Sequence, residues 1–356
     1  MKKYLNKGLM YHWFNSAKMM IFLGIIIWGV SYWGSILSAM NQLSNELSYE
    51  FLNTFKISGI DEFFILGIIF ILIHFASHGM SKISNNMFLT KAPYTKIQIK
   101  FNEFICLMVT LGVFILEYLY LNFMAYIRYY NLMTIADGFF TMTFVDVLRI
   151  FVLGITGILV LLIIDSMFSN VFIGLVCMIT LIPISFMSIA RKFFTILDYI
   201  YVGNDKSVLD IISDRIYYSL NIGRFNIPNY ISGYEGTLNF STSIFIKEIL
   251  LVFIFAIILF AIYIFIQKNF KLESNTKIFT SKLNEKIITV FISLGIGTIL
   301  SYILVESNLK NIVGIHEYPP FEGMNLFKYM SLDIVITIFI SIIVYKIVNK
   351  IVKSIE

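Results

Sequence analysis

The chain has 356 residues, of which 58% are hydrophobic, 17% aromatic and only 14% charged, and its mean hydropathy is +0.82. A soluble domain has about a quarter charged residues, so this composition argues against a separate water-soluble enzyme domain. The net charge of +5 is modest and the basic residues do not cluster among aromatics, which excludes nucleic-acid binding. The cysteines Cys106 and Cys177 lie in apolar blocks and indicate no disulfide framework.

The apolar residues form long blocks, each near the roughly 20 residues that a helix needs to cross a bilayer. We therefore predict an all-α fold, a polytopic integral membrane bundle of about eight transmembrane helices. The predicted spans are Met19–Ser38, Phe63–His78, Asn102–Tyr120, Ile150–Ser166, Val171–Ala190, Ile244–Ile266, Ile287–Val305 and Leu332–Val348. Met167–Asn170 forms a tight hairpin between the fourth and fifth spans, and Pro183 should kink the fifth.

Lysines set the expected orientation, because cytoplasmic loops carry an excess of basic residues. They concentrate before the first span, between the second and third, between the sixth and seventh, and after the eighth. We therefore expect both termini in the cytoplasm. The apolar stretch behind the basic leader is too long for a signal peptide, so the first span should be retained.

Residues 1–18 place Leu5, Leu9 and Trp13 four residues apart, with lysines on another side. This pattern is typical of a short helix that lies in the membrane interface ahead of the first span. The alternative is a plain basic leader.

The segment 81–101 reads SKISNNMFLTKAPYTKIQIKF, with lysines and no acidic residue. Pro93 breaks the backbone, and a helical stretch follows that carries Lys96 and Lys100 one turn apart. We expect an elbow on the cytoplasmic surface. The alternative is a basic loop that only fixes the topology.

The long segment 191–243 should lie outside the membrane as a small extracellular cap. Ser207 and Asp210 resemble a capping box that starts a helix over Val208–Leu220. Glycines and Pro228 then indicate irregular chain. About 50 residues are too few for a catalytic domain with its own core.

Common catalytic motifs are absent. No Gly is followed by Lys, so the chain has no phosphate-binding loop, and neither H-E-x-x-H nor G-x-S-x-G occurs. His74 and His78 stand one turn apart and could take a metal, although interfacial histidines are common without one. Asp210 and Asp214 share a helix face, which is more often a simple response to the helix dipole. We assign no catalytic, cofactor-binding or metal residue.

Glu117 lies well inside the third span, where a charge costs a few kcal/mol unless it faces inward or is neutralised. It is a candidate for lining a transport pathway. The alternative is a structural glutamate that pairs with a neighbouring helix or with Arg128. Glu103, near the cytoplasmic end of the same helix, is a second pathway candidate. We expect it mainly to hold the basic elbow in place.

The segment FLTKAPYTKIQIKFNEFI resembles the cytoplasmic element between the second and third spans of type-2 ABC exporter permeases. The residues that match the pattern of that family in order are Phe88, Leu89, Pro93, Thr95, Lys96 and Lys100. The resemblance implies that these residues form a coupling helix, which docks into a separate ATP-binding subunit.

The resemblance covers residues 1–266 and implies a six-span permease core over 19–266, with coupling segment 81–101 and cap 191–243. Residues 267–356 add a cytoplasmic basic loop and two further spans, similar to Gram-positive permeases of antimicrobial-peptide and cell-envelope stress operons. The implied partners are an ABC ATP-binding subunit, a second permease subunit and the lipid bilayer of a bacterial plasma membrane. No cofactor is implied, since ATP would be bound by the partner.

Three other functions stay open. A secondary carrier would need several ionisable groups inside the membrane, and only Glu117 qualifies clearly. A membrane enzyme acting on lipid-linked substrates would need carboxylates or histidines that converge at one membrane face. An immunity or sensor protein could bind a peptide through residues 191–243.

Overall fold

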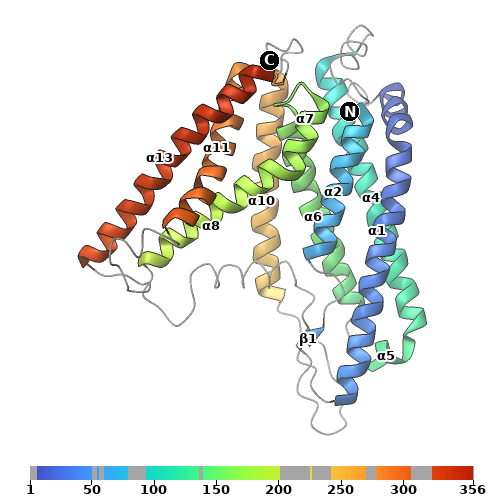
Figure 1. The fold of residues 1–356 in the computed structure, drawn as a ribbon. Helices are drawn as coiled ribbons and strands as arrows, with labels where there is room; N and C mark the ends of the chain where they lie inside the picture. Colours follow the sequence, from blue (N-terminus) through green and yellow to red (C-terminus); the bar gives the residue numbers. More distant parts are fainter. Residues whose placement is uncertain are drawn as a thin grey trace. The chain divides into compact units, whose positions relative to one another are not determined.

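The computed structural model describes residues 6–49, 54–55, 60–78, 94–135, 139–200, 225–226, 242–269, 278–305 and 323–355. Within these ranges the chain is helical, apart from short turns and a pair of two-residue strands, β1 (Thr54–Phe55) and β2 (Phe225–Asn226), which pair antiparallel (Figure 1). The predicted all-α fold is confirmed.

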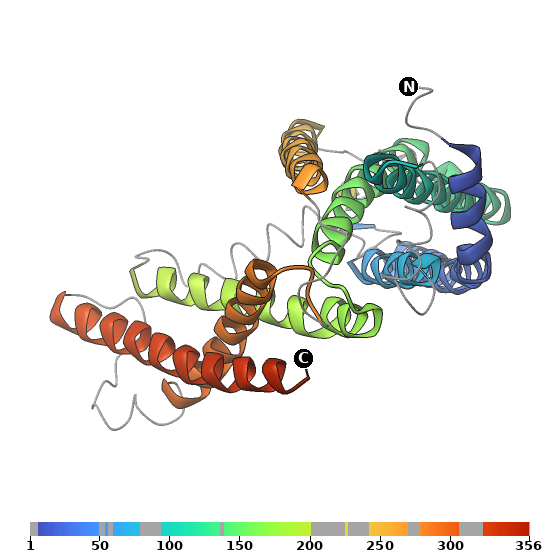
Figure 2. The ribbon, with the colours of Figure 1, turned by 90° about the horizontal axis from the view of Figure 1, so that it is seen from above.

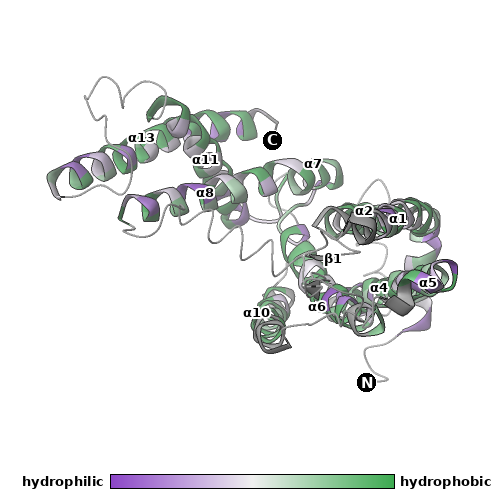
Figure 3. Cartoon of the chain, turned by 90° about the horizontal axis from the view of Figure 1, so that it is seen from below, coloured by the Kyte–Doolittle hydropathy of each residue, from purple (hydrophilic) through white to green (hydrophobic). Residues whose placement is uncertain are grey.

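Among the described residues, seven helical stretches are long and apolar enough to cross a membrane. They are Lys7–Asn41, Gln98–Arg128, Thr143–Asp165, Val171–Ile200, Ile249–Ile266, Lys282–Leu304 and Gly323–Ser354. The second predicted span is present as a shorter apolar helix, Phe63–Ser77. Large apolar side chains such as Leu116 and Phe265 are about two-thirds exposed, as suits contact with lipid. Figure 3 shows long hydrophobic stretches on the labelled helices. The protein is therefore a multi-pass membrane protein.

The chain divides into two compact units. The first comprises Met1–Ile164 and Tyr217–Phe270, and the second comprises Asp165–Ile216 and Lys271–Glu356. The helices of the first unit are α1 (Lys7–Tyr49), α2 (Ile60–His78), α4 (Lys96–Arg128), α5 (Tyr130–Ile135), α6 (Phe139–Asp165) and α10 (Thr242–Asn269). Asp165, the last residue of α6, is also the first residue of the second unit.

Helix α1 runs without a break from Lys7 to Tyr49, so the predicted interfacial residues and the first span belong to one helix. Figure 2 shows its first turns running across the view, whereas the rest of α1 is seen nearly end-on. Leu9, Trp13 and Ala17 share the buried side of these first turns.

Aromatic rings fill the interior of the first unit. Trp28 and Tyr32 on α1 stack with their ring centroids 5.6 Å apart, and Tyr118 on α4 lies 4.9 Å from Tyr32. Phe114 meets the edge of Trp28 at 5.7 Å. All four side chains are at most 2% exposed, so α1 and α4 are joined by a continuous aromatic core.

The second unit contains α7 (Val171–Val176), the π-helical turn η1 (Cys177–Leu181), α8 (Ile182–Ile200), α11 (Lys282–Leu304) and α13 (Gly323–Ile355). A tight turn separates α6 from α7, as predicted, and Asn170 caps α7 by accepting a hydrogen bond from the Ile173 amide. The wide turn η1 lies directly before Pro183, which has no amide hydrogen to donate. Figure 1 shows the helix bending between α7 and α8.

Small residues bring the helices of the second unit together. Helix α11 packs against both α8 and α13. A Cβ atom at Gly295 would lie 2.5 Å from the Cα of Ser185 on α8, and one at Gly297 would lie 2.8 Å from the Cα of Ser341 on α13. The Ser188 hydroxyl also donates to the Gly295 carbonyl at 3.0 Å. Close backbone approach with hydroxyl contacts is the usual way in which membrane helices associate.

Candidate functional site

The predicted elbow leads directly into α4. Thr95 has extended backbone angles and caps the helix: its side chain accepts a hydrogen bond from the Gln98 amide at 3.2 Å, and the Gln98 side chain accepts one from the Thr95 amide at 2.9 Å. This reciprocal pair is a capping box, and it fixes the start of the helix at Lys96. Phe88, Leu89 and Pro93 lie outside the described residues, as does the side chain of Lys96.

Two contacts tie the start of α4 to the start of α1. The Asn6 amide donates to the Asn102 side chain at 3.1 Å. A Cβ atom added to Gly8 would lie 3.2 Å from the Tyr94 hydroxyl. Helix α10 adds a third contact, since the Tyr263 hydroxyl donates to the Lys100 carbonyl at 2.9 Å. The elbow end of α4 is therefore held by α1 and α10.

Lys100 lies inside the protein and is only 5% exposed. Its ammonium donates to Glu103 Oε2 at 2.8 Å, and Glu103 Oε1 lies 3.2 Å from Nδ1 of His74 on α2. Lys100, which the family resemblance assigns to docking, therefore forms an ion pair inside the protein. Glu103 joins the first turns of α4 to α2.

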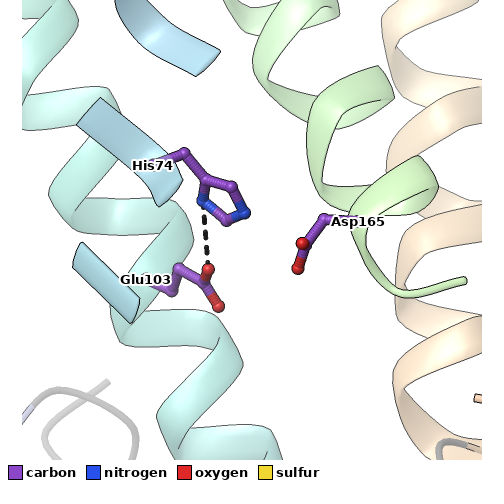
Figure 4. Close-up of side chains that lie close together, drawn as sticks. All are labelled: His74, Glu103 and Asp165. Carbon is purple, nitrogen blue, oxygen red and sulfur yellow. Dashed lines mark ion pairs between the residues drawn. The ribbon is translucent and has the colours of Figure 1, made fainter. Parts of the chain in front are cut away.

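Asp165, at the end of α6, completes a buried polar group with His74 and Glu103. The three side chains come from α2, α4 and α6 and point toward one another (Figure 4), and their ligand atoms lie within 4.8 Å of one another. A histidine and two carboxylates are ligands that several metals accept.

A second buried polar chain joins α1, α4 and α6. Asn122 hydrogen-bonds the Tyr32 hydroxyl, and the Tyr118 hydroxyl donates to Asp146 Oδ2 at 2.9 Å. Arg149 Nη1 lies 3.2 Å from Asp146 Oδ1. All five side chains are at most 3% exposed.

The two polar groups lie toward opposite ends of α6. Asp146 and Asp165 are 19 residues apart on the helix, which corresponds to about 28 Å along its axis. The hydrocarbon core of a bilayer is about 30 Å thick. The two groups are therefore separated along α6 by a distance close to the thickness of the hydrocarbon core.

Glu117 lies against α1. A Cβ atom at Gly29 would overlap its Oε1, so the glycine makes room for the carboxyl group. Its Oε2 is buried, and among the described residues no group donates a hydrogen bond to it. Arg128 is 11 residues further along α4, about 16 Å away along the axis, and its guanidinium lies over the Trp33 ring. Of the two predicted structural contacts for Glu117, the structure shows the neighbouring helix and not Arg128.

The second unit has a buried charged pair of its own. The Lys192 ammonium on α8 hydrogen-bonds Asp333 Oδ1 on α13, and the Tyr199 hydroxyl donates to Asp333 Oδ2 at 3.0 Å. Lys192 is 8% exposed and Asp333 is fully buried. Tyr199 also packs edge-on against Tyr329.

Sequence reasoning missed most of these groups because the predicted spans were trimmed at charged residues. Arg149 lies one residue before the predicted span Ile150–Ser166, and Lys192 lies in the predicted cap 191–243, yet both belong to helical stretches long and apolar enough to cross a membrane. The spacing of Asp146 and Arg149, three residues apart on one helix, was a detectable indication of an internal pair. Nothing in the sequence alone joins Lys192 to Asp333 or His74 to Asp165.

Other predicted features are not tested. The side chain of His78, and Asp210 and Asp214 with most of the predicted cap, lie outside the described residues. No protein-family model, curated protein or solved structure matches the chain.

Proposed function

We propose that the chain is the membrane-spanning permease subunit of an ATP-driven transporter, an exporter energised by a separate ATP-binding subunit. The proposal starts from the resemblance of residues 88–100 to the coupling segment of type-2 ABC exporter permeases. A chain without a phosphate-binding loop must receive the work of ATP hydrolysis from a partner.

The rigid start of α4 is the observation that best supports this proposal. The helix has 33 residues, so it is about 50 Å long and exceeds the thickness of the hydrocarbon core. Its first turn is fixed by the capping box and braced by Asn6, Tyr263 and the Lys100–Glu103–His74 contacts. A force applied at residues 88–96 would move α4 as a whole, together with the helices that it contacts.

The proposal assigns different tasks to the residues of the elbow. Phe88 and Leu89 form the apolar anchor for the ATP-binding subunit, and Lys96 supplies surface charge. Thr95 fixes the helix start, and Lys100 joins the elbow to the bundle from inside. Burying an aromatic anchor is worth roughly 1.5–3 kcal/mol, whereas a lysine at the rim contributes less than about 1 kcal/mol.

Co-expression with a candidate ATP-binding subunit tests the proposal. Phe88→Ala should weaken co-purification more than Lys96→Ala, and both should lower transport-coupled ATP hydrolysis in liposomes. Phe64→Ala is the matched control, because this phenylalanine is 58% exposed on α2 and lies far from the elbow in sequence. Full partner retention and full stimulated hydrolysis in the Phe88→Ala/Lys96→Ala double variant would contradict the proposal.

The same proposal places the chain in a bacterial plasma membrane, paired with a second permease subunit, with both termini in the cytoplasm. A cysteine introduced at Ser207 should react with a membrane-impermeant reagent in intact cells, and one at Ser354 should not. The reverse labelling pattern would overturn the orientation.

The convergence of His74, Glu103 and Asp165 favours a second function, that of a membrane enzyme acting on lipid-linked substrates. Such an enzyme needs carboxylates or histidines gathered at one membrane face. His74→Gln distinguishes the two functions: an enzyme loses turnover at saturating substrate without any ATP requirement, whereas a permease loses only ATP-dependent transport.

A further inference from the structure

Arg149 is a buried charged group that neither proposed function uses. It lies on α6, six residues after the start of the stretch Thr143–Asp165, which corresponds to about 9 Å of helix. Its side chain is 4% exposed. Arginine is rare inside the membrane, and where it occurs it faces a partner or a ligand.

The neighbours of Arg149 balance its charge and leave its donors unused. Asp146 Oδ1 lies 3.2 Å from Nη1, which neutralises the charge, and the Phe63 ring centroid lies 4.7 Å from the guanidinium carbon. The guanidinium carries five N–H donors in one plane. Within the described part of the chain, no group accepts a hydrogen bond from Nε, Nη1 or Nη2.

The unused donors lie in the plane of the guanidinium, where an oxyanion binds. The contact with the Phe63 ring is a cation–π contact, and it takes up none of these donors. An arginine edge is a fork that matches two oxygens of one phosphate or carboxylate. Buried donors without acceptors are unfavourable, so a ligand that supplies those oxygens would be held firmly.

The position of Arg149 along its helix indicates which kind of oxyanion it binds. It lies one to two turns inside the span, on a level with Phe63, the first residue of the apolar helix Phe63–Ser77. This is the depth at which lipid headgroups meet the hydrocarbon. Phe64, Phe144 and Phe151, on the same two helices, are between 42% and 63% exposed and offer contact surface to acyl chains.

We propose that Arg149 binds the phosphate of a phospholipid headgroup through the edge of its guanidinium, with Phe63 covering its face. The lipid would be a bound component of the first unit. Lipid binding at this site does not depend on ATP or on a partner subunit. It can therefore be confirmed or contradicted independently of the proposed transport function.

Native mass spectrometry of the full chain in detergent tests the proposal. The probes are phosphatidylglycerol, the matching diacylglycerol without phosphate, and inorganic phosphate. The wild-type chain should retain phosphatidylglycerol, and Arg149→Gln should bind it about tenfold more weakly or worse. Arg149→Lys should bind with intermediate strength, because it keeps the charge and loses the fork. Arg128→Gln is the matched control, since Arg128 is an exposed arginine of the same unit.

Removing Arg149 alone leaves Asp146 without its counter-ion and can impair folding. The Asp146→Asn/Arg149→Gln double variant removes both charges and should lose the lipid while the chain stays assembled. Equal lipid retention by the wild-type chain and this folded double variant would overturn the proposal. Equal retention of diacylglycerol would do the same, and displacement of the lipid by micromolar inorganic phosphate would assign the site to free phosphate instead.

Discussion

The two units of the protein hold their helices together by different means. The first uses large aromatic rings between α1 and α4 and polar groups such as Tyr118–Asp146–Arg149 toward the ends of the bundle. The second uses glycine and hydroxyl contacts along α11, with the pair Lys192–Asp333 between α8 and α13. The first unit thus excludes lipid with large side chains, and the second brings its backbones close together.

This difference reflects a general feature of the bilayer. Lipid tails are as apolar as leucine, so burying apolar area contributes little to helix association, and packing and hydrogen bonds must provide it. Large rings provide many dispersion contacts, whereas small residues allow short distances between backbones. The two units should therefore respond differently to substitutions of similar size.

The largest effect is expected from breaking the charged pair of the second unit. Lys192→Met leaves Asp333 buried with only Tyr199 as its partner, and the loss of one member of a buried pair costs about 3–5 kcal/mol. Lys192→Met/Asp333→Leu removes both charges and should recover most of that loss. Thermal unfolding in detergent measures both variants. A double variant no more stable than the single one would show that the pair has a role beyond mutual neutralisation.

Adding a methyl group to the glycine contact should have the next largest effect. Gly295→Ala forces α11 away from the Ser185 backbone, and such overpacking costs about 1–3 kcal/mol. Gly157→Ala in α6 is the control, since a Cβ atom there has no neighbour within 4 Å, and alanine favours a helix over glycine by about 1 kcal/mol. Equal melting temperatures for the two variants would contradict the close packing of α11.

Removing one hydroxyl group from the first unit should have an effect of comparable size. Tyr118→Phe keeps the ring in the aromatic core but withdraws the donor from Asp146 Oδ2, at a cost of about 1–3 kcal/mol. Phe114→Leu in the same core serves as a comparison, because it alters the packing and leaves the polar group intact. If Tyr118→Phe melts like the wild-type protein, the hydroxyl contact adds nothing to stability.

The smallest effect on stability is expected at Glu117. Glu117→Gln keeps the shape of a side chain whose Oε2 has no donor in the described structure, so the melting temperature should change little. If Glu117 lines a pathway, the same variant should reduce transport in liposomes. Unchanged transport would leave Glu117 with a structural role against Gly29.

The sequence predicted the membrane-spanning elements well because long apolar blocks are a strong local feature. The predicted spans that correspond to α10 and α11 end within a few residues of the observed helices. The capped start of α4 follows from Pro93 and Thr95. The predicted tight turn before Val171 is also present. Each of these features depends on residues that are close together in the chain.

The buried polar groups could not be predicted in the same way, since they join residues far apart in the chain. His74 and Glu103 come from different helices, and Lys192 and Asp333 are 141 residues apart. Charged residues near the edge of an apolar block also look the same whether they face water or an internal partner. For this reason Arg149 falls one residue outside the predicted span Ile150–Ser166, whereas the structure places its Nη1 3.2 Å from Asp146 Oδ1.

The order in which the helices are made has a consequence for biogenesis. Each unit is built from two separate stretches of chain, so neither is complete before the ribosome has begun the other. Lys192 enters with α8, and Asp333 follows 141 residues later. At roughly 5–20 residues per second, the lysine waits on the order of ten seconds for its counter-ion. During that interval α8 holds Lys192 without the carboxylate that pairs with it in the folded protein, so α8 should rely on the insertion machinery to shield this side chain.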